Sequence, residues 1–396
     1  MNQIKPGTPI RATVTVAHRG VDRWRRGHPW IYQGDVTDAS MPSGPGVVLV
    51  AGPNGRIIGQ ALYSPASQIR LRLVERSDRP LDRSWWEEQL TAAVARRRGI
   101  DATAFRLVHG EGDGLPSLVV DRYDQWLVVQ LLSAGLETMR DTILDALTAV
   151  CAPAGILLRN DAAVRRHEGL AETVELVRGE VPRLVEVREG SVRYLAAPWD
   201  GQKTGAFLDQ RPNRIRAGQL TPPGARALDC FAYHGSFALH LAERAELVVA
   251  LDSSADALAR GREHALMNGR ENIEWREADA FEALRSLDRA RETFDLVVVD
   301  PPAFAKSRAA LGGALRGYHE VNLRAMRLLA PGGILVSASC SFHLRWPEFL
   351  AMIAGAAADS GRRLRVVEHL GQGEDHPELV TVPETGYLKG IVLQRW

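Results

Sequence analysis

From about residue 200 onward, short apolar segments alternate with segments of helical spacing, and this pattern constrains the fold more than any other feature. The apolar segments are ARALDCF, LVVALD, IEWREAD, FDLVVVD and GILVSAS. Strands that are apolar throughout and that alternate with helices form a parallel sheet, which helices cover on both faces. We therefore expect a C-terminal α/β domain with a mainly parallel seven-stranded sheet. Two later segments, RLRVVEHL and YLKGIVLQRW, are expected to close this sheet as antiparallel strands.

The two parts of the chain that precede this region have other patterns. Residues 1–75 contain short apolar segments, with Pro-Asn-Gly at 53–55 as a hairpin turn, and this predicts a small β barrel. Residues 76–185 combine a helical segment at 84–100 with paired strand segments, which predicts a central α+β domain. Residues 186–396 form the third expected domain, and three domains agree with a chain of 396 residues.

Composition excludes several classes of protein. No apolar run reaches the length of about 18 residues that a membrane span needs, so we expect no membrane partner. The chain starts without the apolar core of a signal peptide, so we expect a cytoplasmic protein. The cysteines, Cys151, Cys230 and Cys340, lie far apart and fit neither a disulfide framework nor a zinc site. The histidines form neither an HxH nor an HExxH pattern, so we predict no metal.

The net charge of +1 hides an uneven distribution of charge along the chain. The first 74 residues contain nine basic residues, Lys5, Arg11, Arg19, Arg23, Arg25, Arg26, Arg56, Arg70 and Arg72, against three acids, Asp22, Asp35 and Asp38. A small basic module on an acidic body suits a polyanionic partner such as a nucleic acid. A solvated charged surface is the alternative, and richness in arginine alone does not distinguish the two.

Acidic residues follow consecutive strands of the expected sheet. In such sheets, ligands bind at the carboxyl ends of the strands, where a glycine lets the backbone approach them. The second strand ends in an acid about twenty residues after the acid of the first strand, and a carboxylate at this place can bind a pair of ribose hydroxyls. An acid after the third strand can meet the amine of adenine. The cofactor residues predicted in this region are Asp229, Phe231, Gly235, Asp252, Asp279 and Ala280.

The turn after the first strand, DCFAYHG, lacks the G-x-G-x-x-G pattern of a dinucleotide site. It has one glycine where a phosphate-binding loop needs several. An adenosine cofactor without a pyrophosphate fits better, and this favours S-adenosylmethionine over NAD. Any single Asp at the end of a strand can instead cap a helix. The prediction of a cofactor site therefore depends on finding three such Asp residues in order on consecutive strands.

The fourth strand ends in Asp300-Pro301-Pro302-Ala303-Phe304. The prolines stiffen the turn and remove N–H donors, so that Asp300 and the backbone carbonyls face the site in fixed directions. The carboxylate can hydrogen-bond the Watson–Crick edge of a flipped base, and Phe304 can stack on that base. The alternative is a strand cap with a packed phenylalanine.

Cys340 lies between two serines at the expected carboxyl end of the fifth strand. A buried cysteine is most often a small apolar residue, and we interpret Cys151 in this way, whereas Cys230 packs or lines the cofactor pocket. A thiolate beside Asp300 can add to C6 of a pyrimidine and so activate C5 toward a sulfonium methyl group. Methylation of an exocyclic amine needs no thiol. The pattern therefore indicates methylation of a nucleobase with Cys340 as the nucleophile.

Longer motifs run through nearly the whole chain. They are RRGHPWIY, YSPASQIRLR, HGEGDGLPSLVVDRY, RNDAAVRRHEGL, GQKTGAFLDQRPNR, DCFAYHG, DPPAF, RGYHEVN, SCS and HPELVTVPETGYLKG. With these motifs the chain resembles the bacterial and archaeal large-subunit ribosomal RNA cytosine-C5 methyltransferases that carry an N-terminal PUA domain.

The resemblance implies a PUA domain, a central α+β domain and a Rossmann-like methyltransferase domain, with S-adenosylmethionine as cofactor and large-subunit (23S) ribosomal RNA as partner. It also allows a homodimer. It implies that Cys340 is the nucleophile and that Asp300 aids the base. The residues it places along the cofactor site are Lys203, Thr204, Phe207 and Gln210, with Asp209 in the same segment. The residues it places against the RNA are Arg25, Arg26, His28, Trp30, Pro301, Pro302 and Phe304.

The identity of the base that removes the C5 proton stays open. Many other RNA cytosine-C5 methyltransferases have a cysteine beside the prolines of this turn, whereas DPPAF has none. A uracil-C5 or a purine-nitrogen RNA methyltransferase therefore remains an alternative. A further alternative is a non-catalytic RNA-binding factor of ribosome assembly, against which the complete set of strand-end residues argues.

Overall fold

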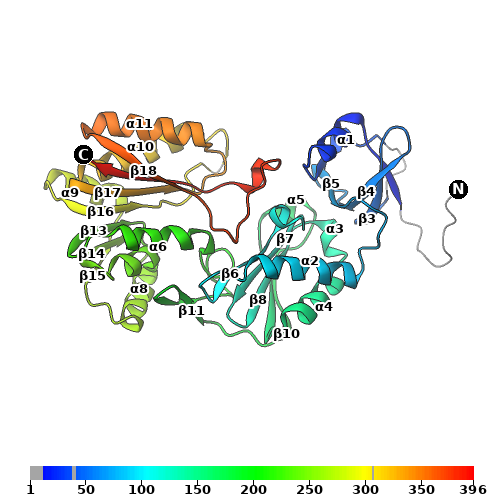
Figure 1. Ribbon diagram of the computed structural model, residues 1–396, viewed down its shortest axis with the longest axis horizontal. Coiled ribbons are helices and arrows are strands. Elements are labelled where there is room, and N and C mark those ends of the chain that lie inside the picture. The colour runs from blue at the N-terminus through cyan, green and yellow to red at the C-terminus, as the bar shows by residue number, and fades with distance from the viewer. Residues whose placement is uncertain (1–11, 38–41, 306) are drawn as a thin grey trace.

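The computed structural model describes residues 12–37, 42–305 and 307–396. Three parts, each built around a sheet of its own, follow one another along the chain (Figure 1). Lys5, Arg11 and Asp38, which contribute to the basic N-terminal charge, lie outside the described residues. No described helix is both long and apolar enough to span a membrane.

The N-terminal part is a five-stranded sheet in the order β1-β3-β4-β5-β2. Its elements are β1 (Thr13–Thr15), α1 (His18–Arg25), β2 (Trp30–Tyr32), η1 (Gln33–Asp35), β3 (Gly46–Ala51), β4 (Ile57–Tyr63) and β5 (Ile69–Glu75). The antiparallel hairpin expected around 53–55 joins β3 to β4. A bridge between Val16 and Val36 links the chain after β1 to the chain after η1, so the two edges of the sheet approach each other.

The central part is a mixed five-stranded sheet in the order β10-β9-β8-β7-β6, in which only β8 and β9 pair in parallel. Its elements are α2 (Arg83–Arg96), β6 (Ala104–His109), η2 (Gly110–Asp113), β7 (Leu118–Tyr123), β8 (Trp126–Leu131), α3 (Ala134–Glu137), α4 (Arg140–Cys151), β9 (Gly155–Asn160), α5 (Val164–His167) and β10 (Thr173–Gly179). Trp85 and Trp86 of α2 pack with Leu144 of α4 in its core. This is the α+β arrangement expected from the sequence.

A hairpin of β11 (Val185–Glu189) and β12 (Val192–Ala196) connects the central and C-terminal parts. Tyr194 shares a core with Tyr123 of β7, whereas Val192 packs with Leu239 and Ala265 of the C-terminal part. The hairpin therefore belongs to both cores. The domain division after residues 75 and 185 stays a prediction.

The C-terminal part is a seven-stranded sheet in the order β15-β14-β13-β16-β17-β19-β18. Its strands are β13 (Ala225–Cys230), β14 (Ala245–Asp252), β15 (Ile273–Glu277), β16 (Phe294–Val299), β17 (Leu329–Ser339), β18 (Leu364–Leu370) and β19 (Lys389–Arg395). Its helices are η3 (Leu208–Gln210), α6 (Arg211–Leu220), α7 (Ser236–Leu241), α8 (Ala255–Met267), α9 (Ala280–Arg289), α10 (Leu311–Arg327), α11 (Trp346–Ser360) and η4 (Pro383–Thr385).

This sheet is mixed, which corrects the expectation of a mainly parallel sheet. The strands from β15 to β17 pair in parallel, but β19 runs antiparallel to both of its neighbours, β17 and β18. Between β18 and β19 the described chain forms only the short η4, and β19 then runs back along the sheet in the opposite direction. Helices cover both faces of the sheet (Figure 1): α9, α10 and α11 pack on one core, and α6 and α7 on the other.

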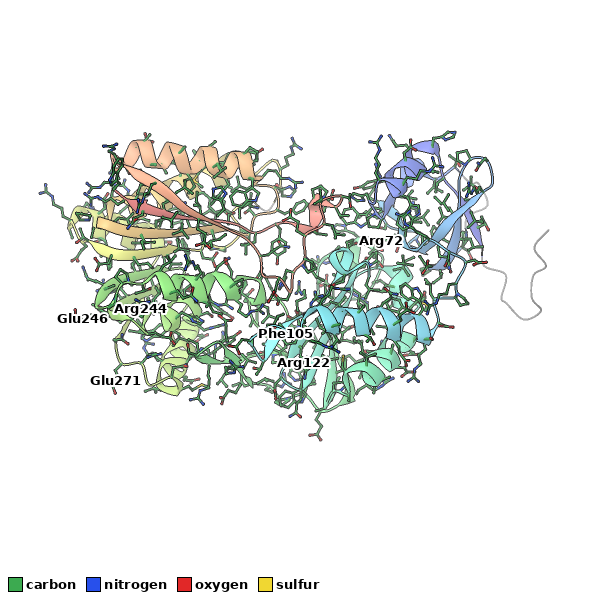
Figure 2. The ribbon with its side chains drawn as sticks, viewed as in Figure 1. Arg72, Phe105, Arg122, Arg244, Glu246 and Glu271 are labelled. Carbon is green, nitrogen blue, oxygen red and sulfur yellow. The ribbon has the colours of Figure 1, made fainter. Side chains whose placement is uncertain are left out.

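Polar contacts join the three parts. Arg72 of β5 pairs with Glu168, which follows α5, at 2.7 Å, and both side chains are buried. Figure 2 labels Arg72 where the N-terminal part meets the central part. The segment between β18 and β19, residues 371–388, leaves the C-terminal sheet and reaches the other two parts (Figure 1). We call it the bridging segment. In it, Glu384 contacts His28 of the N-terminal part at 3.1 Å, and Asp375 accepts a hydrogen bond from the backbone N–H of Arg106 in β6 at 2.9 Å.

Candidate active site

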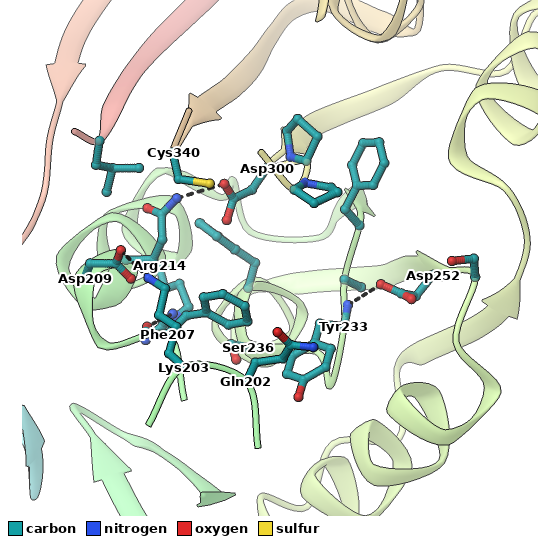
Figure 3. A pocket seen from close by; sticks show the side chains of 18 residues that line it. Gln202, Lys203, Phe207, Asp209, Arg214, Tyr233, Ser236, Asp252, Asp300 and Cys340 are labelled. Atoms are coloured by element: carbon teal, nitrogen blue, oxygen red, sulfur yellow. Dashed lines mark hydrogen bonds and ion pairs between the residues drawn. The ribbon is translucent and has the colours of Figure 1, made fainter. Parts of the chain in front are cut away.

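A cavity of about 310 Å³ lies at the carboxyl ends of β13, β14, β16 and β17 (Figure 3). The carboxyl ends of parallel strands meet at one edge of a sheet, and this edge is where α/β proteins bind ligands. The predicted residues that line the cavity are Lys203, Phe207, Gln210, Phe231, Asp252, Asp300, Pro301, Pro302 and Cys340, together with Asp209 of the segment 201–214. The structure therefore brings together both predicted catalytic residues and half of the predicted cofactor residues.

Asp300 and Cys340 leave neighbouring strands. Val299 of β16 lies opposite Ser337 of β17, so the residues that follow the two strands emerge side by side. Ser341 holds the two loops together, because its hydroxyl accepts a hydrogen bond from the backbone N–H of Ala305 at 3.2 Å and bonds the Tyr318 hydroxyl at 2.7 Å. The thiol and the carboxyl group are thus fixed relative to each other.

A side-chain amide orients Asp300. The Nε2 group of Gln210 donates to Asp300 Oδ1 at 2.9 Å, and Asn213 Nδ2 in turn donates to Gln210 Oε1 at 2.6 Å. Burial raises the pKa of Asp300 to about 7, and the negative charge of Asp209 contributes in the same direction. Asp300 is therefore a carboxyl group that exchanges its proton near neutral pH, the range in which an acid or base is useful to an enzyme.

Asp209 supplies a permanent negative charge to the same cavity. Burial would raise its pKa, but Lys203, whose Nζ lies 2.6 Å from Asp209 Oδ2, holds that pKa well below its usual range. The Tyr387 hydroxyl donates to the same oxygen at 2.7 Å. Asp209 Oδ1 is buried and has no hydrogen-bond partner in the part of the chain that the structure describes.

Cys340 is half-buried at the wall of the cavity. Burial raises the pKa of its thiol to about 11, and the negative charge of Asp300 adds to the increase, while Lys203 opposes it. The thiolate is the nucleophilic form of cysteine. A reaction that uses Cys340 therefore needs positive charge close to the sulfur atom.

The opposite side of the cavity has the features of a nucleoside site. Asp252 Oδ2 accepts the backbone N–H of Tyr233 at 2.7 Å, and Asp252 Oδ1 accepts that of Ser254 at 2.9 Å. Each carboxylate oxygen keeps a second lone pair for a ligand hydroxyl. The loop after β13 is unusual, because Phe231 and Tyr233 have positive φ values of 66° and 52°. Strained backbone of this kind is common at ligand sites.

Gly235 has a different role from the expected one. Its φ is 80°, and a Cβ atom at this position would lie 2.3 Å from the Trp275 ring. The glycine is therefore required by the packing of β15 against this turn, and it does not line the cavity.

Four other predicted residues do not line the cavity. Asp229 is buried and accepts the backbone N–H of Ala238 at 3.0 Å, and burial raises its pKa well above the usual range. Asp279 caps α9 through the N–H of Glu282 at 3.0 Å, and Ala280 is the first residue of that helix. The Thr204 hydroxyl donates to Asp121 of the central part at 2.5 Å. These contacts position the loops around the site.

Phe304 also packs behind the cavity. Its ring centroid lies 4.7 Å from that of Tyr318 and 6.3 Å from that of Phe231, a residue that does line the cavity. The prediction that Phe304 stacks on a base stays untested, whereas the structure gives it a packing role beside the site.

The predicted RNA-binding residues of the N-terminal part lie in two different environments. Arg25 and Arg26 are exposed. His28 Nε2 instead contacts Glu384 of the bridging segment at 3.1 Å, and Trp30 Nε1 donates to Glu111 of the central part at 2.8 Å. His28 and Trp30 thus have structural partners at the domain junctions.

Sequence reasoning missed several cavity residues, namely Gln202, Arg214, Ala232, Tyr233, Ser236, Phe237, Ser253 and Leu388. Half of them lie inside two motifs, Gln202 and Arg214 in GQKTGAFLDQRPNR and Ala232 and Tyr233 in DCFAYHG, so for these four the signal was the motif and not the single residue. Among the described residues, no group of three or more metal-binding side chains is close enough to hold an ion.

Residues 105–394 match the family model described as S-adenosylmethionine-dependent methyltransferase, and residues 14–76 match a PUA-like domain. The chain belongs to this family of methyltransferases. Its cofactor is S-adenosylmethionine. The lining of the cavity fits that molecule, because the carboxylate of Asp252 would be free to accept hydrogen bonds from the ribose hydroxyls. The PUA-like domain confirms the expectation for the N-terminal part.

Curated relatives are similar over almost the whole chain. The protein named ribosomal RNA large subunit methyltransferase I from Aeromonas hydrophila is 38% identical, over 93% of this chain and 96% of its own. The protein of the same name from Salmonella arizonae is 37% identical, over 92% and 93%.

Solved structures show the same fold. A protein described as a SAM-dependent methyltransferase from Streptococcus mutans superposes with a TM-score of 0.82 at 19% identity, over 97% of this chain and 100% of its own. A methyltransferase solved in complex with SAH gives a TM-score of 0.83 at 19% identity, with the same coverage.

Proposed function

We propose that this methyltransferase transfers the methyl group of S-adenosylmethionine to C5 of a cytosine in large-subunit ribosomal RNA, through a covalent bond between Cys340 and C6. The observation that carries the proposal is the thiol of Cys340 beside Asp300 in the cavity that Asp252 also lines. A nitrogen atom attacks a sulfonium methyl group directly, so a methyltransferase of purine nitrogen would have no use for this thiol. The names of the curated relatives support the ribosomal RNA substrate.

The reaction takes three steps at the pyrimidine ring. The Cys340 thiolate adds to C6, and the electron pair of the C5–C6 double bond moves onto C5 and its conjugated ring atoms. C5 then takes the methyl group that S-adenosylmethionine supplies, with S-adenosylhomocysteine as the leaving group. A base removes the C5 proton, the double bond re-forms, and the thiolate leaves C6.

Asp300 favours cytosine over uracil in this scheme. Its pKa of about 7 leaves a large fraction protonated at neutral pH, so the group can donate a hydrogen bond. N3 of cytosine is an acceptor, whereas N3 of uracil carries a hydrogen atom of its own. A donor at N3 stabilises the electron density that thiolate addition places on the ring. A cytosine ring therefore matches the protonated carboxyl group better.

The pH dependence of the reaction tests the role of Asp300. The rate depends on the protonated carboxyl group of Asp300, whose pKa is about 7, and on the thiolate of Cys340, whose thiol has a pKa of about 11. Below pH 7 only the thiolate fraction changes with pH, so we expect kcat/KM of the wild type to rise with pH. Above pH 7 the loss of the Asp300 proton offsets the gain in thiolate, so kcat/KM should level off. The Asp300→Asn variant keeps a donor that does not titrate. It should lose roughly 10² in rate at pH 6 but continue to rise above pH 7, and a plateau that begins at the same pH as in the wild type would contradict the assignment.

Covalent trapping tests the proposed function directly. Fluorine at C5 cannot leave as a proton does, so 5-fluorocytidine-substituted ribosomal RNA should capture the wild type as a denaturation-resistant adduct in the presence of S-adenosylmethionine. The Cys340→Ser variant should form none. An adduct only with 5-fluorouridine would move the target to uracil. No adduct, together with methylation of unmodified RNA by both proteins, would establish nitrogen methylation.

A further inference from the structure

Lys389 is a buried cation beside the proposed nucleophile. It is the first residue of β19 and lies opposite Ser339 of β17, the residue before Cys340. Only 4% of Lys389 is exposed. Its Nζ donates to the backbone carbonyl of Ser341 at 2.8 Å and to that of Tyr387 at 2.6 Å. The ammonium group is thus fixed against the two chain segments that flank the thiol.

The partners of Lys389 leave its charge unneutralised. Both of its hydrogen-bond acceptors are backbone carbonyls, and within the described residues no carboxylate lies at ion-pairing distance from Nζ. A buried ammonium group normally has a carboxylate partner, because burial of an unpaired charge is costly. The charge of Lys389 is therefore compensated only when the neighbouring Cys340 is a thiolate, which carries a negative charge.

We propose that the ammonium group of Lys389 stabilises the thiolate of Cys340 and so determines the pH at which the nucleophile forms. The inference rests on the proposed function, since it assigns Lys389 to the activation of the same thiol. Lys389 acts on the sulfur through its charge and is a positioning residue, one that does not touch the substrate.

The other charged groups around the two residues support this assignment. Asp300 and Asp209 oppose ionisation of Cys340, and the nearby Tyr318 is uncharged at neutral pH. Lys203 favours ionisation, but its charge is already paired with Asp209 and its side chain is 36% exposed. Arg214 also lines the cavity, but its charge is paired with Glu189 at 2.5 Å. Lys389 differs from both in having no carboxylate partner among the described residues. Burial lowers the pKa of Lys389 to about 8, attraction to Cys340 raises it, and Arg345 and Glu348 act in opposite directions. Electrostatic coupling is reciprocal, so Lys389 favours the thiolate equally.

Alkylation of the free protein tests the inference without RNA or cofactor. The rate at which iodoacetamide labels Cys340 is followed from pH 6 to 11 by mass spectrometry of its peptide, in the wild type, Lys389→Met and Lys389→Arg. An opposite charge nearby lowers a pKa by about one unit or more. We therefore expect Lys389→Met to label Cys340 about tenfold more slowly than the wild type at pH 7, where the ammonium group of Lys389 is charged, and Lys389→Arg to restore most of the labelling rate.

Two internal controls separate this effect from damage to the fold. Arg395→Met removes a cation from the other end of β19 and should leave the labelling rate at pH 7 unchanged. Cys230, which is fully buried, should stay unlabelled in every folded variant. An unchanged labelling rate in Lys389→Met, with Cys230 protected, would overturn the inference. The proposed function has a test of its own: it fails if no RNA adduct forms, even where the Lys389→Met variant labels more slowly.

Discussion

The Cys340→Ala variant is expected to bind S-adenosylmethionine like the wild type and to transfer no methyl group to RNA. The expected loss in kcat is roughly 10⁴-fold or more, the scale on which removal of a covalent nucleophile acts. Cofactor binding should survive, because Asp252 and the loop at 231–235 belong to β14 and β13, and the side chain of Cys340 makes none of their hydrogen bonds. Calorimetric titration with S-adenosylmethionine and transfer of a labelled methyl group to ribosomal RNA measure the two properties separately.

Cys151→Ala is the matched control for this experiment. Cys151 ends α4 in the central part, and it is not among the described residues that line the cavity. We expect full methyl transfer from this variant. Substantial methylation by Cys340→Ala would contradict thiol catalysis and would favour direct attack by a base nitrogen. Loss of both cofactor binding and methylation would instead assign Cys340 a packing role.

The candidate site could largely be predicted from the sequence, because its position follows from topology. Apolar strands that alternate with helices pair in parallel, and the residues that end those strands then meet at one edge. Asp252, Asp300 and Cys340 were predicted in this way and line one cavity. The same rule was less accurate for Asp229 and Asp279, since a strand-end Asp that caps the following helix has the same sequence signature.

Properties that depend on contacts between distant segments could not be predicted. The pKa of Asp300 depends on burial and on Asp209, and the partner of Lys389 is the carbonyl of Ser341, far away in the chain. His28 and Trp30 have the composition of an RNA-binding surface, but both hydrogen-bond acids of other domains. Periodicity describes one element at a time, and it contains no information on which elements meet.

The replacement of Asp375 is expected to cause the largest loss of stability. Asp375 lies in the bridging segment and is fully buried. Burial would raise its pKa, but hydrogen bonding and charge from His376, together with Arg211, hold that pKa well below its usual range. Its carboxylate accepts two hydrogen bonds from Arg211 at 3.1 and 3.2 Å and one from the N–H of Arg106 at 2.9 Å. Asp375→Ala would leave Arg211 as a buried charge without a partner.

Removal of one partner from a buried ion pair costs about 3–5 kcal/mol, and we expect this reduction in the free energy of unfolding for Asp375→Ala at pH 7. A carboxyl group with a depressed pKa contributes stability above its unfolded-state pKa and loses it as the pH falls. The advantage of the wild type over Asp375→Asn should therefore be complete at pH 7 and decrease below about pH 4. Urea unfolding at several pH values measures both effects.

Asp359→Ala is the control for this prediction, because Asp359 pairs with His319 on the surface and its side chain is 64% exposed. Its replacement should change the free energy of unfolding by no more than about 0.5 kcal/mol. Equal effects of the two replacements would show that Asp375 is not a major support of the bridging segment. A large effect of Asp375→Ala alone, accompanied by a higher KM for RNA, would indicate that this segment holds the three parts in the arrangement that the substrate requires.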